Sequence, residues 1–296
     1  MSATGADHEK NWAARSSVFA AVGLTGFKIV VGLATGSLGI LAEAAHSGLD
    51  LVAALMTWMA VRISGKPADR EHRYGHGKVE NLSAFGETVL LLITCAWIVY
   101  SAVNRLIEHT IEIEVTVWSF AVMITSVIID VSRSRMLYRV ARKFNSQALE
   151  ADALHFSTDI WSSAVVILGL ISVKLSEWVA GWGGLRYADA VAAIIVAVIV
   201  AQISLRLGMR TIRALLDTAP SGLDESITAA VLLVPGVTNC HNVRLRYSGP
   251  QLFVDIHILV DGNQTLRAAH ALTEEIERAI QKLVPDADVT VHPEPV

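Results

Sequence analysis

Cysteine and clustered positive charge are both scarce in this chain, and each shortage excludes a class of protein. The chain has 296 residues but two cysteines, Cys95 and Cys240, too few for a disulfide framework and too far apart for a CxxC site. The formal net charge is −4 and the basic residues form no binding stripe, so we expect no nucleic-acid partner. No small-residue cleavage site follows the polar opening MSATGADHEKNWAARS, so we expect no cleavable signal peptide.

Long hydrophobic runs dominate the first two thirds of the chain. Hydrophobic residues make up 53% of the sequence, and the mean hydropathy is +0.48. A helix that spans a bilayer needs about 20 mostly apolar residues. Six segments qualify, at 13–35, 38–62, 82–104, 114–131, 148–173 and 187–208. The sequence therefore predicts an α-helical membrane protein with a six-transmembrane-helix bundle over residues 1–212.

The basic residues indicate how these helices cross the membrane. Most of them fall in the connections at 62–80 and 132–147 or after the sixth segment: Arg62, Lys66, Arg70, Arg73, Lys78, Arg133, Arg135, Arg139, Arg142, Lys143, Arg206, Arg210 and Arg213. The other side holds Arg105, Lys174 and Arg186, with Trp178, Trp182 and Tyr187 as interfacial aromatics. Because Lys and Arg are retained on the cytoplasmic side, we expect both termini in the cytoplasm and a multi-pass protein of the inner (plasma) membrane.

Residues 213–296 have the pattern of a separate domain. Helical spacing at 223–233 and 265–283 alternates with strand-like segments at 241–247, 252–260 and 287–292, and Ser248-Gly249-Pro250 marks a turn. The order αββαβ predicts a small two-layer α+β domain. In the second strand, Ile256 and Ile258 alternate toward the core, so His257 is expected on the opposite, more exposed face.

One spacing occurs twice in the predicted bundle: an acidic residue, two residues, His, three residues, Asp. The two copies are Glu43, His46, Asp50 and Asp152, His155, Asp159. His and Asp four residues apart share a helix face, so two facing helices would present two imidazoles and two carboxylates, a set that suits tetrahedral zinc. These residues could instead be structural, but an ionisable side chain inside a membrane costs roughly 2.5–3.5 kcal/mol, which favours an ion pathway. Glu43 and Asp152 are expected to orient the imidazoles.

A second cluster lies in the loop PADREHRYGHGKVE at 67–80. Asp69, His72 and His76 could bind a metal there, with the glycines letting the loop fold around the ion. A solvated charged loop is the alternative interpretation, and the pattern by itself does not decide between them.

The C-terminal region is dense in histidine. His241, His257, His270 and His292, followed by Glu294, fall within one short domain. Isolated surface histidines are common, but four that converge on one sheet edge would form a metal site. Both interpretations stay open at this stage.

With these motifs the chain resembles the cation diffusion facilitator family of zinc and related metal/proton antiporters, over roughly residues 12–295. The resemblance implies a ferredoxin-like C-terminal domain, a transport site of His46, Asp50, His155 and Asp159, and a loop site of Asp69, His72 and His76. It also implies a cytoplasmic metal site at a dimer interface, formed by His241, His257, His270 and His292 with Glu294. Lys78 and Asp217 match a pair that locks the helix bundles of the dimer.

Two residues depart from the family pattern. Some bacterial members, of the ferrous-iron/zinc efflux type, have Asp where this chain has His46, and a His there is similar to the zinc-preferring members. Glu294 stands where the family often has the shorter Asp.

The resemblance and the motifs together predict a zinc-preferring efflux transporter that exchanges metal for protons by alternating access. Cd²⁺, Co²⁺ or Fe²⁺ are possible substrates, and the expected partners are protons, membrane lipid and a second copy of the chain. We expect no enzymatic activity. A membrane metallohydrolase is the main rival, but it would keep one zinc position open for water. A metal-sensing scaffold is a third possibility, for which intramembrane His and Asp pairs would have no use.

Overall fold

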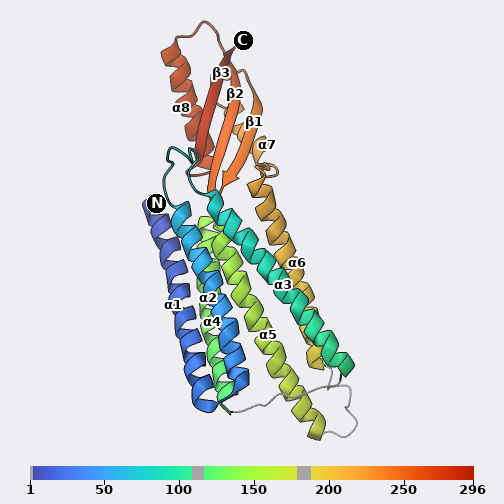
Figure 1. Cartoon of the computed structure of the whole chain (residues 1–296). Helices are drawn as coiled ribbons and strands as arrows, with labels where there is room; N and C mark the ends of the chain where they lie inside the picture. Colours follow the sequence, from blue (N-terminus) through green and yellow to red (C-terminus); the bar gives the residue numbers. More distant parts are fainter. Residues whose placement is uncertain (1–2, 109–116, 179–187) are drawn as a thin grey trace.

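The computed structural model describes residues 3–108, 117–178 and 188–296, and its first six helices form an elongated bundle (Figure 1). These helices are α1 (Ala3–Thr35), α2 (Leu38–Ser64), α3 (Lys78–Glu108), α4 (Val117–Phe144), α5 (Gln147–Trp178) and α6 (Ala188–Leu215). Gly36, at a φ of 67°, makes the tight turn from α1, and the Ser37 side chain caps α2 by accepting from the Ile40 N–H. The predicted outer-interface residues Trp182 and Tyr187 lie outside the described residues.

The predicted connection at 132–147 is wrong. Helix α4 continues through this segment to Phe144, and Asn145 and Ser146 alone separate it from α5. Residues 132–144 contain neither glycine nor proline, and their arginines and lysine favour helix. The charged segment therefore extends the helix instead of interrupting it, and α4 and α5 form an antiparallel hairpin.

The exterior of the bundle is apolar, as expected of a protein surrounded by lipid, and its interior holds charged side chains beside apolar clusters. Large side chains such as Leu33, Ile93 and Trp97 are exposed on the outside, whereas Glu80 and Glu87 are fully buried. Four of the described helices are long and apolar enough to cross a membrane: Gly5–Thr35, Leu38–Ser64, Lys78–Asn104 and Val191–Leu215. The predicted count of six spans is therefore supported for four helices and stays a prediction for α4 and α5.

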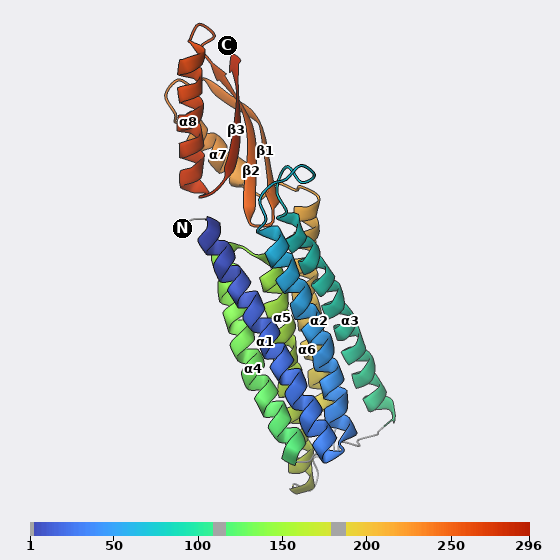
Figure 2. The same ribbon diagram turned by 60° about the vertical axis from the view of Figure 1, so that its left-hand side comes forward.

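The C-terminal domain lies beyond one end of the bundle, the end at which α1 begins, in both views (Figure 2). Its elements are α7 (Leu223–Leu232), β1 (Asn239–Ser248), β2 (Gln251–Val260), α8 (Leu266–Leu283) and β3 (Asp288–Pro295). The predicted αββαβ order is confirmed. The sheet has the order β1-β2-β3, with β1 and β2 antiparallel and β2 and β3 parallel.

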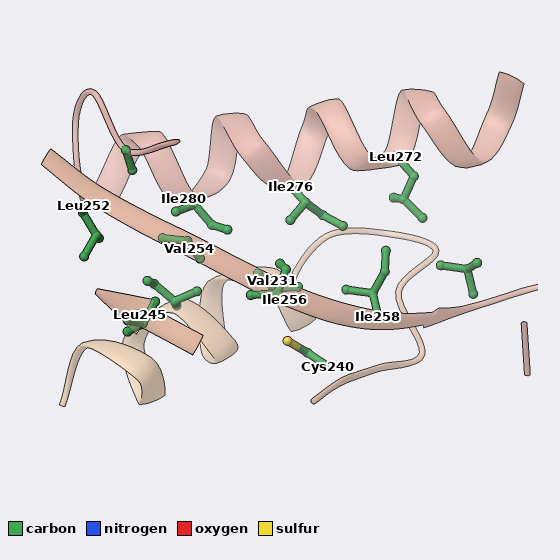
Figure 3. Close-up of a cluster of buried hydrophobic side chains, with 13 residues drawn as sticks. Val231, Cys240, Leu245, Leu252, Val254, Ile256, Ile258, Leu272, Ile276 and Ile280 are labelled. Carbon is green, nitrogen blue, oxygen red and sulfur yellow. The ribbon is translucent and has the colours of Figure 1, made fainter. Parts of the chain in front are cut away.

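The core of this domain follows from strand alternation. Ile256 and Ile258 of β2 are buried against Ile276 and Ile280 of α8 (Figure 3). Alternation then places His257 on the sheet face away from this core, as predicted. The domain buries an apolar core of its own, so the face bearing His257 is free to carry polar ligands.

Candidate metal sites

The repeated His and Asp motifs of α2 and α5 converge where the two helices meet, with Asp50 and His155 buried and the His46 side chain 47% exposed. The His155 Nε2 atom lies 3.1 Å from Asp50 Oδ1, and His46 Nε2 lies 3.8 Å from Asp159 Oδ1. The pairs within each helix are 4.0 Å apart on α2 and 3.9 Å apart on α5. The structure thus brings together all four residues predicted for the transport site, and their two imidazoles and two carboxylates can supply a tetrahedral shell.

The acidic residue that begins each motif, Glu43 on α2 and Asp152 on α5, has another partner. Glu43 Oε2 lies 3.2 Å from Lys28 Nζ, and Lys28 also donates to Ser47 Oγ at 2.8 Å. The buried Asp152 accepts a hydrogen bond from Ser17 Oγ at 3.3 Å. The prediction that Glu43 and Asp152 orient the imidazoles is therefore not supported by any hydrogen bond among the described residues, because a lysine and a serine of α1 occupy these carboxylates.

The loop cluster also forms. Asp69 faces both histidines, with Oδ1 at 3.4 Å from His72 Nδ1 and Oδ2 at 3.3 Å from His76 Nε2. The backbone N–H groups of His72 and Glu71 donate to Asp69 Oδ1. These hydrogen bonds, above all the one from His72, hold the pKa of Asp69 below its ordinary value. Gly75 turns the chain between the two histidines at a φ of 75°. One carboxylate and two imidazoles can therefore chelate one cation, with the carboxylate kept ionised.

Three histidines form a row across the C-terminal sheet. His241 of β1, His257 of β2 and His292 of β3 are register partners, so they share one face. Glu294 lies beside this row, with Oε1 at 2.8 Å from His257 Nδ1 and Oε2 at 3.4 Å from His241 Nε2. The hydrogen bond with His257 is the main cause that lowers the pKa of Glu294. Sequence reasoning missed Asn242, whose Nδ2 lies 3.2 Å from His257 Nε2.

His270 stands apart from this row within one chain. It lies on α8, the helix that covers the core face of the sheet, and its side chain is 73% exposed beside Glu274. The sheet separates it from His257. Its predicted role in the cytoplasmic metal site therefore stays a prediction that needs a second copy of the chain.

Comparison with known proteins gives two family matches that together cover nearly the whole chain. Residues 14–216 match the model of the cation efflux transmembrane domain, and residues 220–296 match that of the cation efflux protein cytoplasmic domain. This chain belongs to the cation diffusion facilitator family. The predicted resemblance is confirmed, and the protein is a multi-pass cation efflux transporter with a dimerisation-type C-terminal domain.

Relatives of this cation diffusion facilitator extend over most of its length. The cation-efflux pump FieF of Cronobacter sakazakii is 34% identical over 290 residues, which is 96% of this chain and 92% of the relative. FieF of Shewanella oneidensis is 31% identical over 288 residues, 96% of this chain and 93% of the relative. Among solved structures, the zinc form of the putative zinc transporter CzrB is 31% identical, and the match covers 26% of this chain and 88% of that one with a TM-score of 0.25.

The facilitator joins its two domains through a small set of contacts. Lys78 Nζ lies 2.9 Å from Asp217 Oδ1, so the pair that the resemblance implied is in contact within one chain. Tyr74 of the loop packs edge-on against Phe253 of β2, and Arg246 lies 4.0 Å from the Tyr74 ring centroid. The loop that carries the second cluster is therefore also the loop that contacts the C-terminal sheet.

The interior of the facilitator also holds charged residues that the motifs do not include. These buried residues are Lys10, Lys28, Glu80, Glu87, Asp130 and Arg133. Each lies in one of the long bundle helices, where an ionisable residue is itself a signal of function. Their sequence signal is a charged residue within a bundle helix, whether or not it belongs to the repeated motif.

Proposed function

We propose that this cation diffusion facilitator exports divalent metal from the cytoplasm in exchange for protons, with zinc as its preferred substrate. The observation that carries the proposal is the convergence of His46 and Asp50 on α2 with His155 and Asp159 on α5. Two nitrogen and two oxygen donors suit zinc, whereas magnesium and calcium favour more oxygen ligands. Cadmium, cobalt and iron(II) are weaker candidates on the same donor chemistry.

Proton coupling follows from the imidazole ligands. A neutral imidazole binds a metal ion and a protonated one does not, so protons that reach the site compete with the metal. When the bundle opens to the more acidic side, protonation of His46 and His155 releases the ion. When it opens to the cytoplasm, the histidines lose protons and bind metal again, so the metal and the protons move in opposite directions through one site.

The domain roles complete the proposal. Residues 1–212 form the transport domain in the inner membrane, and residues 213–296 form a cytoplasmic domain through which two chains dimerise. Both termini are cytoplasmic. The Asp69 cluster and the histidine row with Glu294 bind cytoplasmic metal. That binding favours the bundle arrangement in which these two clusters bind metal more tightly.

The decisive experiment measures zinc flux into proteoliposomes with a zinc-sensitive dye. Asp50→Ala and Asp159→Ala each remove one of four ligands, and the three that remain must hold a dication where water is scarce, so we expect transport to be lost while the dimer stays folded. Asp224→Ala is the control, because it also removes a carboxylate but lies exposed in the first turn of α7, outside the bundle. Near-normal flux in either aspartate variant would refute the proposed site.

A further inference from the structure

Helix α4 carries a carboxylate at the depth of the four-ligand cluster. Ser134 Oγ donates to the Ala153 carbonyl oxygen at 3.0 Å and lies 2.7 Å from Ser157 Oγ, which fixes how α4 and α5 align. The two helices are antiparallel, so one turn back from Ser134 corresponds to one turn forward on α5. Asp130 is therefore level with the turn that contains Asp159.

A buried arginine accompanies this carboxylate. Arg133 is 4% exposed and Asp130 is 8% exposed, and Arg133 Nη1 lies 3.5 Å from Asp130 Oδ1. Arg133 also donates twice to Ser17 Oγ of α1, at 3.0 and 3.3 Å, and its guanidinium lies 3.6 Å from the ring centroid of Phe156, the neighbour of His155. Arg133 thus links α1, α4 and α5 immediately beside the transport site.

That position creates an electrostatic problem for a metal transporter. The carboxylates of Asp152 and Asp130 interact with Arg133 most strongly, and those of Asp50 and Asp159 also interact with it, so its positive charge in turn acts on the ion that Asp50 and Asp159 bind. In a poorly screened interior, a fixed cation at this place repels a dication. The charged groups that act on Asp130 from the packed helices are Asp159 of α5, Asp50 of α2, Lys28 of α1 and Arg133 of its own helix.

We propose that Asp130 is a positioning residue that, together with Asp152, offsets the charge of Arg133, so that Arg133 can hold three helices together without weakening metal binding at the transport site. This inference rests on the proposed function. Removing the Asp130 charge makes the group formed by Arg133, Asp130 and Asp152 more positive by one charge, and removing the charges of both Asp130 and Arg133 restores the net charge of that group. A purely structural role for the pair predicts the opposite order, because the double variant would lose more contacts than the single one.

The test measures initial rates of zinc uptake in proteoliposomes over a range of free zinc. Asp130→Asn should raise KM at least tenfold, which is about 1.4 kcal/mol, with little change in the maximum rate. Asp130→Glu keeps the charge and should stay within about threefold of the wild-type KM, and the double variant D130N/R133Q should return to that range. Ser126→Ala is the control, because Ser126 is a buried, uncharged residue one turn away whose hydroxyl bonds to its own helix.

Two results would overturn the inference. One is a KM in Asp130→Asn within about twofold of wild type, and the other is a double variant that stays tenfold weaker. If Asp130→Asn does not fold, as judged by size and thermal unfolding without metal, the double variant decides alone by the same limits. Wild-type protein that moves no zinc, or Asp50→Ala that moves it normally, would instead refute the proposed function.

Discussion

The loop after α2 contacts the turn between β1 and β2, and a substitution at this contact tests whether it holds the two domains together. A Cβ atom added at Gly77 would lie 2.2 Å from the Ser248 carbonyl oxygen and 2.7 Å from its carbonyl carbon. Beside it, the Gly249 N–H donates to Asn81 Oδ1 at 3.0 Å. Gly77→Ala must therefore push the turn away from the loop, because backbone atoms cannot move aside as a flexible side chain can.

The size of the effect follows from the nature of the overlap. Gly77 is not among the glycines with positive φ, so alanine can adopt its backbone conformation and the cost comes from steric overlap alone. Forcing an extra carbon into a packed site costs typically about 1–3 kcal/mol. If this free energy destabilises the contact between the loop and the turn, the fraction of molecules in which the two are separated rises by about 5- to 150-fold.

Amide hydrogen exchange of the purified protein measures this opening directly. We expect exchange to rise by that factor in the 65–77 loop and at the 248–250 turn, while the core of the C-terminal domain stays protected. Gly23→Ala is the control, since nothing lies within 4 Å of its added Cβ. Exchange in Gly77→Ala that matches this control would show that the contact does not hold the domains together.

Two further predictions concern the metal clusters. His46→Asp replaces a nitrogen donor by oxygen, so transport of iron(II) or manganese(II) should rise relative to zinc, and an unchanged ratio between metals would place selectivity elsewhere. Because the pKa of Glu294 is lowered from 4.5, its contribution to stability is present above that value and is lost as the pH falls through the lower folded value. Thermal unfolding of residues 213–296 between pH 7 and 3 should therefore depend less on pH in Glu294→Gln, and identical profiles would contradict this.

The sequence was most informative where a pattern repeats. The spacing of His and Asp in α2 and α5 predicted a convergence that the structure shows, because a four-residue interval fixes a helix face whatever the surroundings. Strand alternation likewise placed His257 off the core. Such patterns depend on local geometry alone, so one sequence without relatives suffices to recognise them.

Contacts between helices were predicted less well, since they depend on which elements become neighbours. Glu43 and Asp152 share their motif with the histidines but contact Lys28 and Ser17 of α1. The charged segment after 131 was predicted as a connection because the apolar run ends there, but a helix can continue past the end of its apolar run, and α4 continues to Phe144. Which side chain meets which requires the packing of the whole bundle.

The charged residues outside the motif show why the interior of this bundle is more than a set of metal ligands. Lys28 and Glu43 pair between α1 and α2, and Arg133 and Asp130 pair on α4, so each buried cation has a carboxylate beside it. A transport site for a dication needs an excess of negative charge, whereas a bundle that holds its helices with lysine and arginine adds positive charge. Pairing each cation with its own carboxylate meets both requirements, because Asp50 and Asp159 are then left free to compensate the metal.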